Sequence, residues 1–500
     1  MFTSKNIVIV GGGTAGWLTA LYVNKISPDL NITLIESEEI GILGAGEGSV
    51  PTLTEFFNFL EIDEKEFIKE TNATFKLGIL FDNWNGHGKD YFHSFNVAHH
   101  KLDYGFDDYG ELYNAYVGYL YKNNLPFNVG ELGEKMAREN KSPYVDQVLD
   151  GVDYIPKYAF HFDANLVAKF LKKVAIERGV IRVEGKVQDF TQDEKGNITQ
   201  VNLQDKSINS DFVFDCSGFQ RLIIGKLFKS PWKSYTKQLK ANSALTFQIP
   251  QFEDKLEPYT KAICMKNGWM WQIPLQNRIG CGYVYDNNYI TEQQAQTEIE
   301  EYLGHSIEPL NNINFKAGAY EKVWINNCLA IGLSSAFTEP IEATSIFNAT
   351  TQLQVLTKEA LETYDQKYID QYNMHALAMN DKVLDFLHFH YITKRKDTKF
   401  WKEYSETTEF TMPLKTFLET WNNTALPNSY FQTNPFSLHS WLAVGYGLDL
   451  FNRRVFEKEY MKVPMMRMVQ HIMYLKNWGE QLLKRAYTAK EYIDKITKDL

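Results

Sequence analysis

Long apolar runs are absent from this chain of 500 residues. No stretch reaches the ~18 uninterrupted apolar residues that a membrane-spanning helix needs, and residues 1–5 lead straight into a strand pattern without an apolar signal segment. Long basic runs are also absent, and the formal net charge is −10, which argues against a nucleic-acid surface. We therefore expect a cytoplasmic protein that acts on neither membranes nor nucleic acids.

Cysteines are few, and metal-binding patterns are absent. The four cysteines all lie in apolar stretches typical of strands: Cys216, Cys264, Cys281 and Cys328. Two histidine pairs have no carboxylates at ligand spacing: His99 with His100, and His388 with His390. These patterns predict reduced core cysteines and no metal site.

The chain has ample material for a core, since 44% of its residues are hydrophobic and 14% are aromatic. A chain of this length usually divides into domains. Strand and helix patterns alternate over the first third, and the pattern is helical from about residue 350 almost to the end. We predict an α/β nucleotide-binding module over residues 1–350, packed closely against a mostly helical substrate-side region over residues 351–500. A homo-oligomer is left open.

A glycine-rich turn near the amino terminus is the best-defined motif. Residues 6–10 form a continuous apolar strand pattern, residues 11–16 are Gly-Gly-Gly-Thr-Ala-Gly, and a helical pattern follows. In a G-x-G-x-x-G turn, Gly11 makes the tight turn, Gly13 lets the backbone approach a pyrophosphate, and Gly16 allows the helix to pack closely on the strand. The alternative is a tight strand–helix turn without a ligand.

The residues around this turn complete a dinucleotide site. The amides of Thr14 and Ala15 at the helix start, together with the helix dipole, suit a phosphate group. Glu36 ends the next strand pattern, 23 residues after Gly13. Its carboxylate suits hydrogen bonds to ribose hydroxyls and disfavours the 2′-phosphate of NADP. The sequence therefore predicts a bound dinucleotide.

An aromatic strand pattern lies in the middle of the chain. Trp269 and Trp271 are two residues apart, so on a strand both indoles point to one face, and Pro274 ends the strand because it lacks an N–H. An aromatic hairpin packed in a core explains this pattern equally well. The segment Trp-Met-Trp-Gln-Ile-Pro resembles the W-x-W-x-I-P signature of the flavin-dependent halogenases, in which the two indoles would form a wall beside the flavin.

Further segments resemble the same family. Residues 44–51, Gly-Ala-Gly-Glu-Gly-Ser-Val-Pro, are similar to its G-x-G-E-x-x-x-P segment, and residues 73–79 place Lys76 in an otherwise uncharged, largely apolar stretch. Tryptophan halogenases carry their catalytic lysine in a matching x-F-K-x-G setting, so the resemblance implies that Lys76 is catalytic. By itself, a lysine is expected on the surface of an edge strand.

Residues 324–346 contain the second catalytic candidate. A buried strand pattern, a small-residue loop and a helix follow one another, and the segment resembles I-G-x-x-x-x-F-x-E-P-x-E-S-T of the family, whose second glutamate is catalytic. That glutamate is Glu342 here, and the alternative is a charge at a helix start. Thr344 and Ser345 at the helix start would bind the halide. Ala343 stands where serine is usual, which removes a hydroxyl group from this part of the site.

The resemblance covers most of the chain and implies an FAD-binding, Rossmann-like module of the flavin monooxygenase type. It implies further FAD contacts at Val187, Leu333 and Ile346. Reduced FAD, O2 and a halide ion would give hypohalous acid, which reaches an aromatic, indole- or phenol-like substrate by way of Lys76. Glu342 would orient the reacting group or accept the proton that leaves the ring.

Several expectations complete this reading. A separate flavin reductase is expected because the chain has no second nucleotide fingerprint, and bromide or iodide is expected over chloride because larger halides are oxidised more easily. The lysine-, asparagine- and tyrosine-rich sequence resembles environmental or phage-encoded members with a broad substrate range. The alternatives are an FAD-dependent monooxygenase, an oxidoreductase that uses NAD(P)H internally, and a binding protein without activity.

Overall fold

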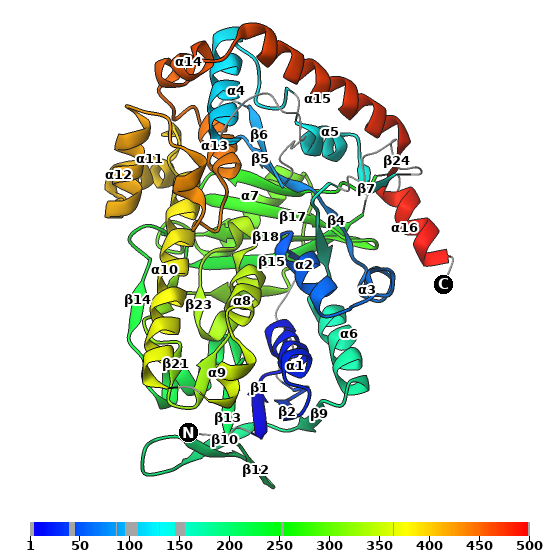
Figure 1. The fold of residues 1–500 in the computed structure, drawn as a ribbon, viewed down its shortest axis with the longest axis vertical. Helices are drawn as coiled ribbons and strands as arrows, with labels where there is room; N and C mark the ends of the chain where they lie inside the picture. The colour runs from blue at the N-terminus through cyan, green and yellow to red at the C-terminus, as the bar shows by residue number, and fades with distance from the viewer. Residues whose placement is uncertain are drawn as a thin grey trace. The chain divides into compact units, whose positions relative to one another are not determined.

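The computed structural model describes residues 5–39, 46–86, 88–95, 109–129, 131–145, 156–251, 255–363 and 365–498. Figure 1 shows the helices and strands of the chain. Contacts between residues divide the chain into two compact units, each made of three separated segments. Unit 1 comprises residues 1–73, 162–236 and 316–381, and unit 2 comprises residues 74–161, 237–315 and 382–500. The expected division at residue 350 follows the chain linearly and stays a prediction.

Unit 1 is built on a sheet in the order β21-β22-β13-β1-β2-β9. Neighbouring strands from β22 to β9 are parallel, and β21 pairs antiparallel with β22. The strands are β1 (Asn6–Val10), β2 (Asn31–Glu36), β9 (Ile181–Glu184), β13 (Phe212–Asp215), β21 (Trp324–Ile325) and β22 (Cys328–Ala330). The central strands β1, β13 and β22 are almost wholly buried, as the apolar pattern predicts, whereas the edge strand β9 has no buried residue. The parallel strands and the helix between β1 and β2 confirm the predicted α/β, Rossmann-like architecture.

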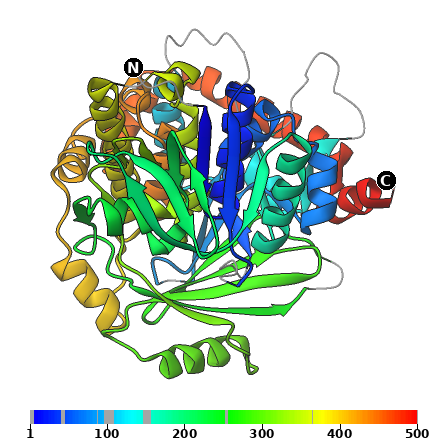
Figure 2. The same ribbon diagram turned by 90° about the horizontal axis from the view of Figure 1, so that it is seen from below.

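The helices of unit 1 include α1, which follows the glycine turn, and α6, which packs against it (Figure 2). The helices are α1 (Thr14–Ile26), α2 (Thr52–Phe59), α3 (Glu64–Thr71), α6 (Ala164–Glu177), α8 (Thr344–Gln354), α9 (Lys358–Glu362) and the part of α10 (Gln366–His390) up to residue 381. Smaller strands complete the unit: β3 (Glu47–Gly48), β10 (Val187–Gln192), β11 (Ile198–Leu203), β12 (Ser207–Asn209), β14 (Trp232–Ser234), β20 (Gly318–Tyr320) and β23 (Ala336–Phe337).

One strand expectation in this unit is wrong. The pattern of residues 180–187, Val-Ile-Arg-Val-Glu-Gly-Lys-Val, predicts a single strand, but β9 ends at Glu184 and β10 begins at Val187 in a different sheet. Gly185 between them has φ +154°, which turns the chain. Apolar and charged residues alternate through this segment as they do along a strand, and only the glycine indicates the break.

Unit 2 is built on a larger sheet in the order β19-β15-β18-β17-β16-β5-β6. Its strands are antiparallel except for the parallel pair of β16 and β5. The bounds are β5 (Gly78–Asp82), β6 (Asp90–Ser94), β15 (Ser243–Pro250), β16 (Thr260–Met265), β17 (Gly268–Pro274), β18 (Arg278–Tyr285) and β19 (Asn311–Asn314). Helix α7 (Glu292–Leu303) covers one face, where Ala295 and Ile299 join the core of the sheet.

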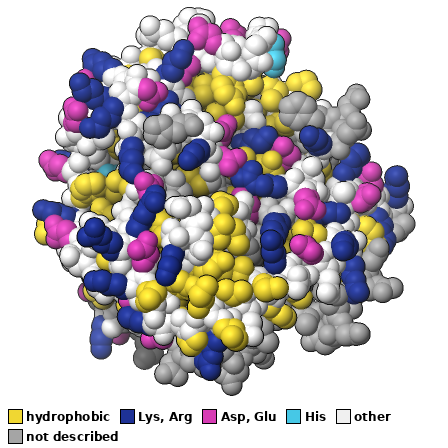
Figure 3. All heavy atoms as spheres, turned by 90° about the horizontal axis from the view of Figure 1, so that it is seen from above, with side chains coloured by type: hydrophobic (Ala, Val, Ile, Leu, Met, Phe, Trp, Pro, Cys, Tyr) yellow, Lys and Arg dark blue, Asp and Glu magenta, His cyan; other side chains and the backbone are white. Residues whose placement is uncertain are grey.

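Helices form most of the carboxy-terminal part of unit 2, as the sequence predicts. They are α11 (Lys399–Thr407), α12 (Met412–Trp421), α13 (Leu438–Gly447), α14 (Arg453–Met461), α15 (Met465–Arg485) and α16 (Ala489–Lys498). The other elements are β4 (Thr74–Lys76), β8 (Ala159–Phe162), α4 (Tyr109–Asn123), α5 (Leu132–Arg138), β7 (Lys141–Val145) and β24 (Ala486–Thr488). The end of the molecule where α14 and α15 lie has apolar side chains among charged ones (Figure 3), and Met461, Met465 and Met466 are exposed.

Two general expectations can be compared with these elements. All four cysteines are free and buried, which confirms their place in the core. Among the described residues, no helix is both long and apolar enough to cross a membrane.

Candidate functional site

The glycine turn of unit 1 has the geometry that its motif requires. Gly11 has φ +119°, and a Cβ built on it would lie 2.2 Å from the carbonyl oxygen of Cys216. A Cβ on Gly16 would lie 1.9 Å from the carbonyl oxygen of Gly11. Neither position tolerates a side chain, because the first strand, the turn and α1 are in contact there.

Gly13 differs from its neighbours in a way that fits a ligand. A Cβ built on Gly13 has no atom of the described residues within 4 Å. Gly13 precedes α1, and no side chain caps the helix start, so the first amides of the helix, at Thr14 and Ala15, are available to an anion. Open space in front of uncapped amides is what the pyrophosphate of a dinucleotide needs.

Glu36 lies over this turn. A Cβ on Gly12 would lie 1.8 Å from Oε2 of Glu36, so the end of β2 and the turn touch. The other carboxylate oxygen, Oε1, accepts hydrogen bonds from Nε of Arg182 at 2.6 Å and forms an ion pair with Nζ of Lys172 at 2.8 Å. The carbonyl of Glu36 accepts a hydrogen bond from the amide of Gly185 at 2.9 Å, two residues before Val187. The structure thus brings Glu36 to the glycine turn and the start of β10 close to Glu36.

The loop that carries Leu333 also reaches the glycine turn. It forms one turn of 3₁₀ helix over Gly332–Ser334, and Leu333 is half-buried. Gly332 has φ +69°, and a Cβ built on it would lie 3.0 Å from the Cβ of Ala15. The turn and the loop expected on the flavin side are therefore packed together, as the predicted FAD contacts require.

Gln352 holds this loop from α8. Its Oε1 accepts a hydrogen bond from the amide of Gly332 at 3.2 Å and lies 3.1 Å from Oγ of Ser335. The Ser335 hydroxyl has one proton and lies closer, at 2.7 Å, to the carbonyl of Gly332. The hydrogen bond from the Gly332 amide is therefore the main contact by which Gln352 holds the loop, and a buried amide needs such an acceptor.

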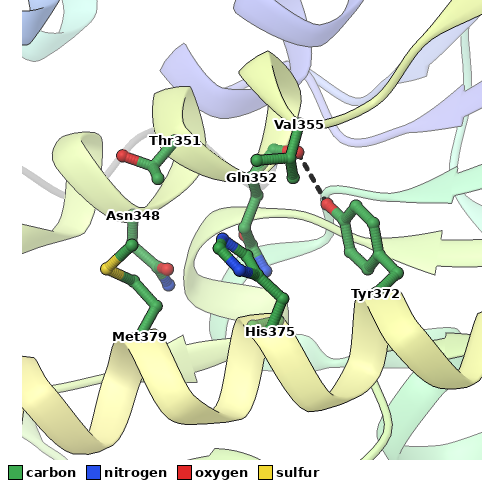
Figure 4. A pocket seen from close by; sticks show the side chains of 8 residues that line it. Asn348, Thr351, Gln352, Val355, Tyr372, His375 and Met379 are labelled. Carbon is green, nitrogen blue, oxygen red and sulfur yellow. Dashed lines mark hydrogen bonds between the residues drawn. The ribbon is translucent and has the colours of Figure 1, made fainter. Parts of the chain in front are cut away.

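A small cavity lies between α8 and α10, next to Gln352 (Figure 4). Tyr372 closes one side, and its hydroxyl donates a hydrogen bond to the carbonyl of Gln352 at 2.7 Å. His375 and Met379 of α10 face Gln352 and Asn348 of α8 across it. Its volume of about 10 Å³ is the size of one water molecule. An aromatic substrate does not fit, so this cavity is not the substrate pocket.

Glu342 and the expected halide residues lie at a strained junction. Glu342 ends a 3₁₀ turn over Pro340–Glu342 and is buried. Ala343 follows with φ +54°, in the left-handed region that non-glycine residues rarely adopt. Helix α8 begins directly after it at Thr344 without a side-chain cap, so the first amides of α8, at Thr344 and Ser345, lie at an open helix start. The predicted strand–loop–helix order is confirmed.

The other predicted residues of this helix and loop are also placed. Thr344 is buried, and its hydroxyl lies 2.9 Å from that of Thr338. Ser345 is half-buried, and Ile346 is buried on the next position of the helix. The buried hydroxyl pair fixes the entry to α8 where the backbone is strained.

Glu47 is an unexpected titratable group in unit 1. It belongs to the part of the glycine-rich segment that lies within the described residues, while residues 44 and 45 lie outside them. Burial and the negative charge of Asp163 raise the pKa of Glu47 to about 7. Asp163 itself caps α6 by accepting hydrogen bonds from the amides of Asn165 and Leu166. Glu47 is therefore a carboxyl group that titrates near neutral pH.

Lys76 lies in the core of unit 2. It is the last residue of β4 and only 1% of its surface is exposed, so the surface position expected for an ordinary lysine is wrong. Its ammonium nitrogen lies 5.4 Å from the centre of the Phe95 ring, within range of a cation–π interaction. A buried lysine is rare and needs specific partners, which favours a functional role.

The aromatic strand of unit 2 follows the predicted pattern. Trp269 and Trp271 lie on β17, which ends at Pro274, and their ring centres are 6.1 Å apart. The ring of Trp271 lies flat against Gly282 on the next strand, where a Cβ would be 2.1 Å from Cζ2 of the indole. Met270 between them packs on the opposite face in the core of the sheet. Glycine at position 282 thus makes the space in which the indole wall lies.

Thr74 joins β4, which carries Lys76, to β17, which carries Trp269 and Trp271. Its hydroxyl donates a hydrogen bond of 2.6 Å to the carbonyl of Pro274, and it lies two residues before Lys76 on β4. The structure therefore brings Lys76 and the end of the aromatic strand together within unit 2.

Sequence reasoning missed Gln352, Thr74 and His161 as parts of these sites. They belong to no nucleotide or metal motif, and a polar residue inside an apolar stretch is their main signal. Among the described residues, no group of three or more histidine, cysteine or acidic side chains forms a candidate metal site. His99 and His100 lie outside those residues, and Nδ1 of His390 donates a hydrogen bond to the carbonyl of Phe386 at 2.8 Å.

Comparisons with known proteins agree with these features. The tryptophan halogenase family matches residues 6–461. The chain is 37% identical over 429 residues to tryptophan 7-halogenase RebH of Lentzea aerocolonigenes, which covers 80% of this chain and 78% of that protein.

Solved structures give the same answer. Tryptophan 6-halogenase SttH of Streptomyces toxytricini is similar with a TM-score of 0.88 and 30% identity, over 98% of this chain and 99% of that one. A flavin-dependent halogenase from Xanthomonas campestris is similar with a TM-score of 0.87 and 30% identity, over 99% and 98% of the two chains. The glycine turn, the aromatic strand and the buried lysine therefore belong to a member of the tryptophan halogenase family, and the protein is a flavin-dependent halogenase whose family implies FAD as the cofactor.

Proposed function

We propose that the protein halogenates an aromatic, indole- or phenol-like small molecule, with Lys76 as the residue that delivers the halogen. The observation that carries this proposal is the burial of Lys76 in unit 2, beside the end of the aromatic strand. An amine in such a place is shielded from water, and it can act on a small oxidant that a lysine on the surface would never hold.

Lys76 can act in either of its protonation states. As an ammonium group it donates a hydrogen bond to hypohalous acid and polarises the bond between oxygen and halogen. As a free amine it takes up the halogen to form a haloamine, and water leaves. In both cases the halogen reaches the substrate from one fixed point, which gives the reaction its selectivity.

Residues of unit 1 support the cofactor and the halide. FAD supplies the reaction of reduced flavin with O2, which oxidises the halide to hypohalous acid. The amides of Thr14 and Ala15 and the space at Gly13 would hold its pyrophosphate, and Glu36 its ribose. Val187, Leu333 and Ile346 would contact the rest of the cofactor.

The start of α8 would bind the halide ion and stabilise the positive charge that develops on the aromatic ring of the substrate. The amides of Thr344 and Ser345 lie at an uncapped helix start, which suits a halide ion. The carboxylate of Glu342, two residues before Thr344, would stabilise positive charge in the halogenated ring or accept its proton. We expect bromide or iodide to be used in preference to chloride because each is more easily oxidised.

The substrate and the source of reduced flavin are inferred by analogy. RebH and SttH are named as tryptophan halogenases, which supports an indole-type substrate. Trp269 and Trp271 would form the wall that keeps this substrate away from the flavin, so that oxygen is not transferred to it directly. A separate flavin reductase would supply reduced FAD.

The direct test is mass spectrometry of an indole and phenol panel. Each compound is incubated with the protein, FAD, a flavin reductase and O2, with chloride, bromide or iodide in turn and with no halide. We expect halogenated product that requires the protein and a halide. A parallel incubation with methionine in excess removes hypohalous acid from bulk solution, because thioethers react with such oxidants, and halogenation inside the protein should persist.

Other outcomes identify the alternatives. Hydroxylated product without halide would replace the proposal by an FAD-dependent monooxygenase. Oxidation of NAD(P)H by the protein without a reductase would indicate an internal nicotinamide site. Product that disappears entirely when methionine is added would mean that Lys76 does not deliver the halogen.

A further inference from the structure

A chain of buried hydrogen bonds lies beside Lys76 in unit 2. Nδ1 of His161 lies 3.2 Å from Oγ1 of Thr74, and Nε2 of His161 lies 2.9 Å from Oγ1 of Thr260. Thr74 in turn donates to the carbonyl of Pro274 at 2.6 Å. The chain therefore joins β4, β8 and β16 to the end of the aromatic strand, and His161, Thr74 and Thr260 are all buried.

The direction of each hydrogen bond follows from the number of protons. The carbonyl oxygen of Pro274 can only accept, so the single hydroxyl proton of Thr74 points to it. Oγ1 of Thr74 must then accept from Nδ1–H of His161. In a neutral imidazole this leaves Nε2 without a proton, so the hydroxyl of Thr260 donates to it.

The surroundings keep this imidazole neutral. Burial and the nearby charge of Lys76 hold the pKa of His161 well below its usual range. A protonated ring would place a second positive charge beside the Lys76 side chain, away from water. The neutral tautomer with a proton on Nδ1 satisfies every hydrogen bond of the chain.

Thr74 is the link between this chain and Lys76. The two residues are the first and last of the three-residue strand β4, so their side chains share one face. Thr74 pairs with His161 and Lys76 with Ala159 across β4 and β8. A strand this short has few backbone hydrogen bonds to fix it, so the side-chain bonds of Thr74 carry much of its placement.

We propose that His161 is a positioning residue for Lys76: its neutral imidazole, protonated on Nδ1, holds Thr74 and thereby fixes β4 against the end of the aromatic strand. This rests on the proposed role of Lys76 in halogen delivery. His161 touches neither halide nor substrate in this role, and it acts only through the strand that carries the lysine.

Three substitutions separate the two sides of the ring. The amide nitrogen of Asn in His161→Asn can replace Nδ1–H and keep the bond to Thr74, whereas that of Gln in His161→Gln reaches the place of Nε2. His161→Phe removes both. We expect His161→Phe to lower halogenated product per flavin oxidised by about 10- to 100-fold, the scale of a displaced catalytic group. His161→Asn should restore most of it and His161→Gln little.

A matched control is His388 of α10. It is also buried in unit 2, burial and Lys240 lower its pKa to about 4, and its ring stacks on Phe410 with centres 5.1 Å apart. Its Nδ1 has no hydrogen-bond partner among the described residues. His388→Phe should change the melting temperature but leave the product yield per flavin unchanged. A loss of yield that only follows the melting temperature across all four variants would overturn the proposal.

Two further measurements do not depend on turnover. Correlation of ring ¹H and ¹⁵N signals in ¹⁵N-histidine-labelled protein should show His161 as the neutral ring with its proton on Nδ1, and a charged ring or the other tautomer at neutral pH would overturn the proposal. Acetylation of Lys76 by acetic anhydride, followed by peptide mass spectrometry, should be faster in His161→Phe, with Lys261 as the internal reference. If the parent protein makes no halogenated product but both results hold, the proposed function fails and the positioning role stands; an unchanged acetylation rate overturns that role.

Discussion

The glycine turn of unit 1 and the strand β4 of unit 2, which carries Lys76, differ in what forms the candidate site: backbone in the first and side chains in the second. Around Gly13 the backbone itself forms the site, and the structure leaves space where a side chain would be. Around Lys76 side chains form the site, and the space is filled by Phe95, Thr74 and His161. A site formed by the backbone requires residues without side chains, such as Gly13. A site formed by side chains requires that specific residues pack around one functional group, such as the ammonium group of Lys76. Substitutions should therefore fail differently in the two units.

The largest effect is expected at Lys76. Lys76→Ala removes the only group proposed to deliver the halogen, so halogenated product should fall below detection while FAD binding and flavin oxidation continue. Product analysis and flavin absorbance measure the two separately. The control is Lys261→Ala, which removes a half-buried lysine of unit 2, on β16, that pairs with Glu257 at 2.7 Å and should keep the parent yield. Normal yield from Lys76→Ala would show that this lysine is structural.

The second effect concerns binding and not chemistry. Gly13→Val should abolish FAD retention, because its side chain enters the space left for the pyrophosphate. The backbone at Gly13 is extended, with φ −76° and ψ −179°, which valine adopts readily. The variant should therefore melt at the parent temperature. Calorimetry and flavin fluorescence check this, and unchanged FAD affinity at a normal melting temperature would contradict the cofactor site.

The same contrast explains how much of the molecule the sequence predicts. The sequence predicts the glycine turn, the strand before it and Glu36 at the end of β2, because backbone geometry restricts which residues can occupy these positions. The buried position of Lys76 is not readable from its own stretch, since a three-residue strand gives no periodicity and an isolated lysine suggests a surface.

Long-range partners are the other part that local patterns cannot give. His161 and Thr74 are 87 residues apart in the chain, and Gln352 meets Gly332 from another element. The turn at Gly185 cannot be predicted from the local pattern, because apolar and charged residues alternate on both sides of it as in a strand. The resemblance to a family singled out Lys76 and Glu342 as catalytic candidates. The residues that surround these two side chains could be identified only from the fold.

The next effect is expected at Glu342 of unit 1, whose negative charge can be compared with Lys76 of unit 2 by its effect on halogenation. Glu342→Gln keeps the shape of a buried side chain but removes its negative charge, so halogenation should fall by about 10²-fold, the size of one lost electrostatic or general-base contribution. Flavin oxidation should continue. The matched variant Glu339→Gln changes an equally buried carboxylate three residues earlier and should reduce halogenation less. Equal losses would mean that Glu342 acts only as a charge near a helix start.

A smaller effect should appear in the way the stability of the protein depends on pH, through Glu47 of unit 1. The pKa of Glu47 is raised to about 7 by burial and by Asp163, above its value in the unfolded chain, so the folded protein favours the neutral form. Stability is therefore present at low pH and is lost as pH rises from about 4.5 through 7. Glu47→Gln should remove this loss, and its melting temperature should exceed that of the parent increasingly between pH 5 and pH 7.5. A constant difference across that range would contradict the raised pKa.

The smallest expected effect is a change of preference without loss of activity. Ser345 is the second residue of α8 and half-buried at an uncapped helix start, so its side chain limits the space beside the amides proposed to bind the halide. Ser345→Gly enlarges that space and keeps the amides. The ratio of iodinated or brominated to chlorinated product should rise by about fivefold, the lower end of the roughly 1–3 kcal/mol that one methylene-sized group in a pocket is worth. Competition experiments with mixed halides measure this ratio, and flavin affinity provides the control. Because Lys76 lies in the other unit and is untouched, total product with bromide alone should stay at the parent level; a changed total with an unchanged ratio would place the halide away from α8.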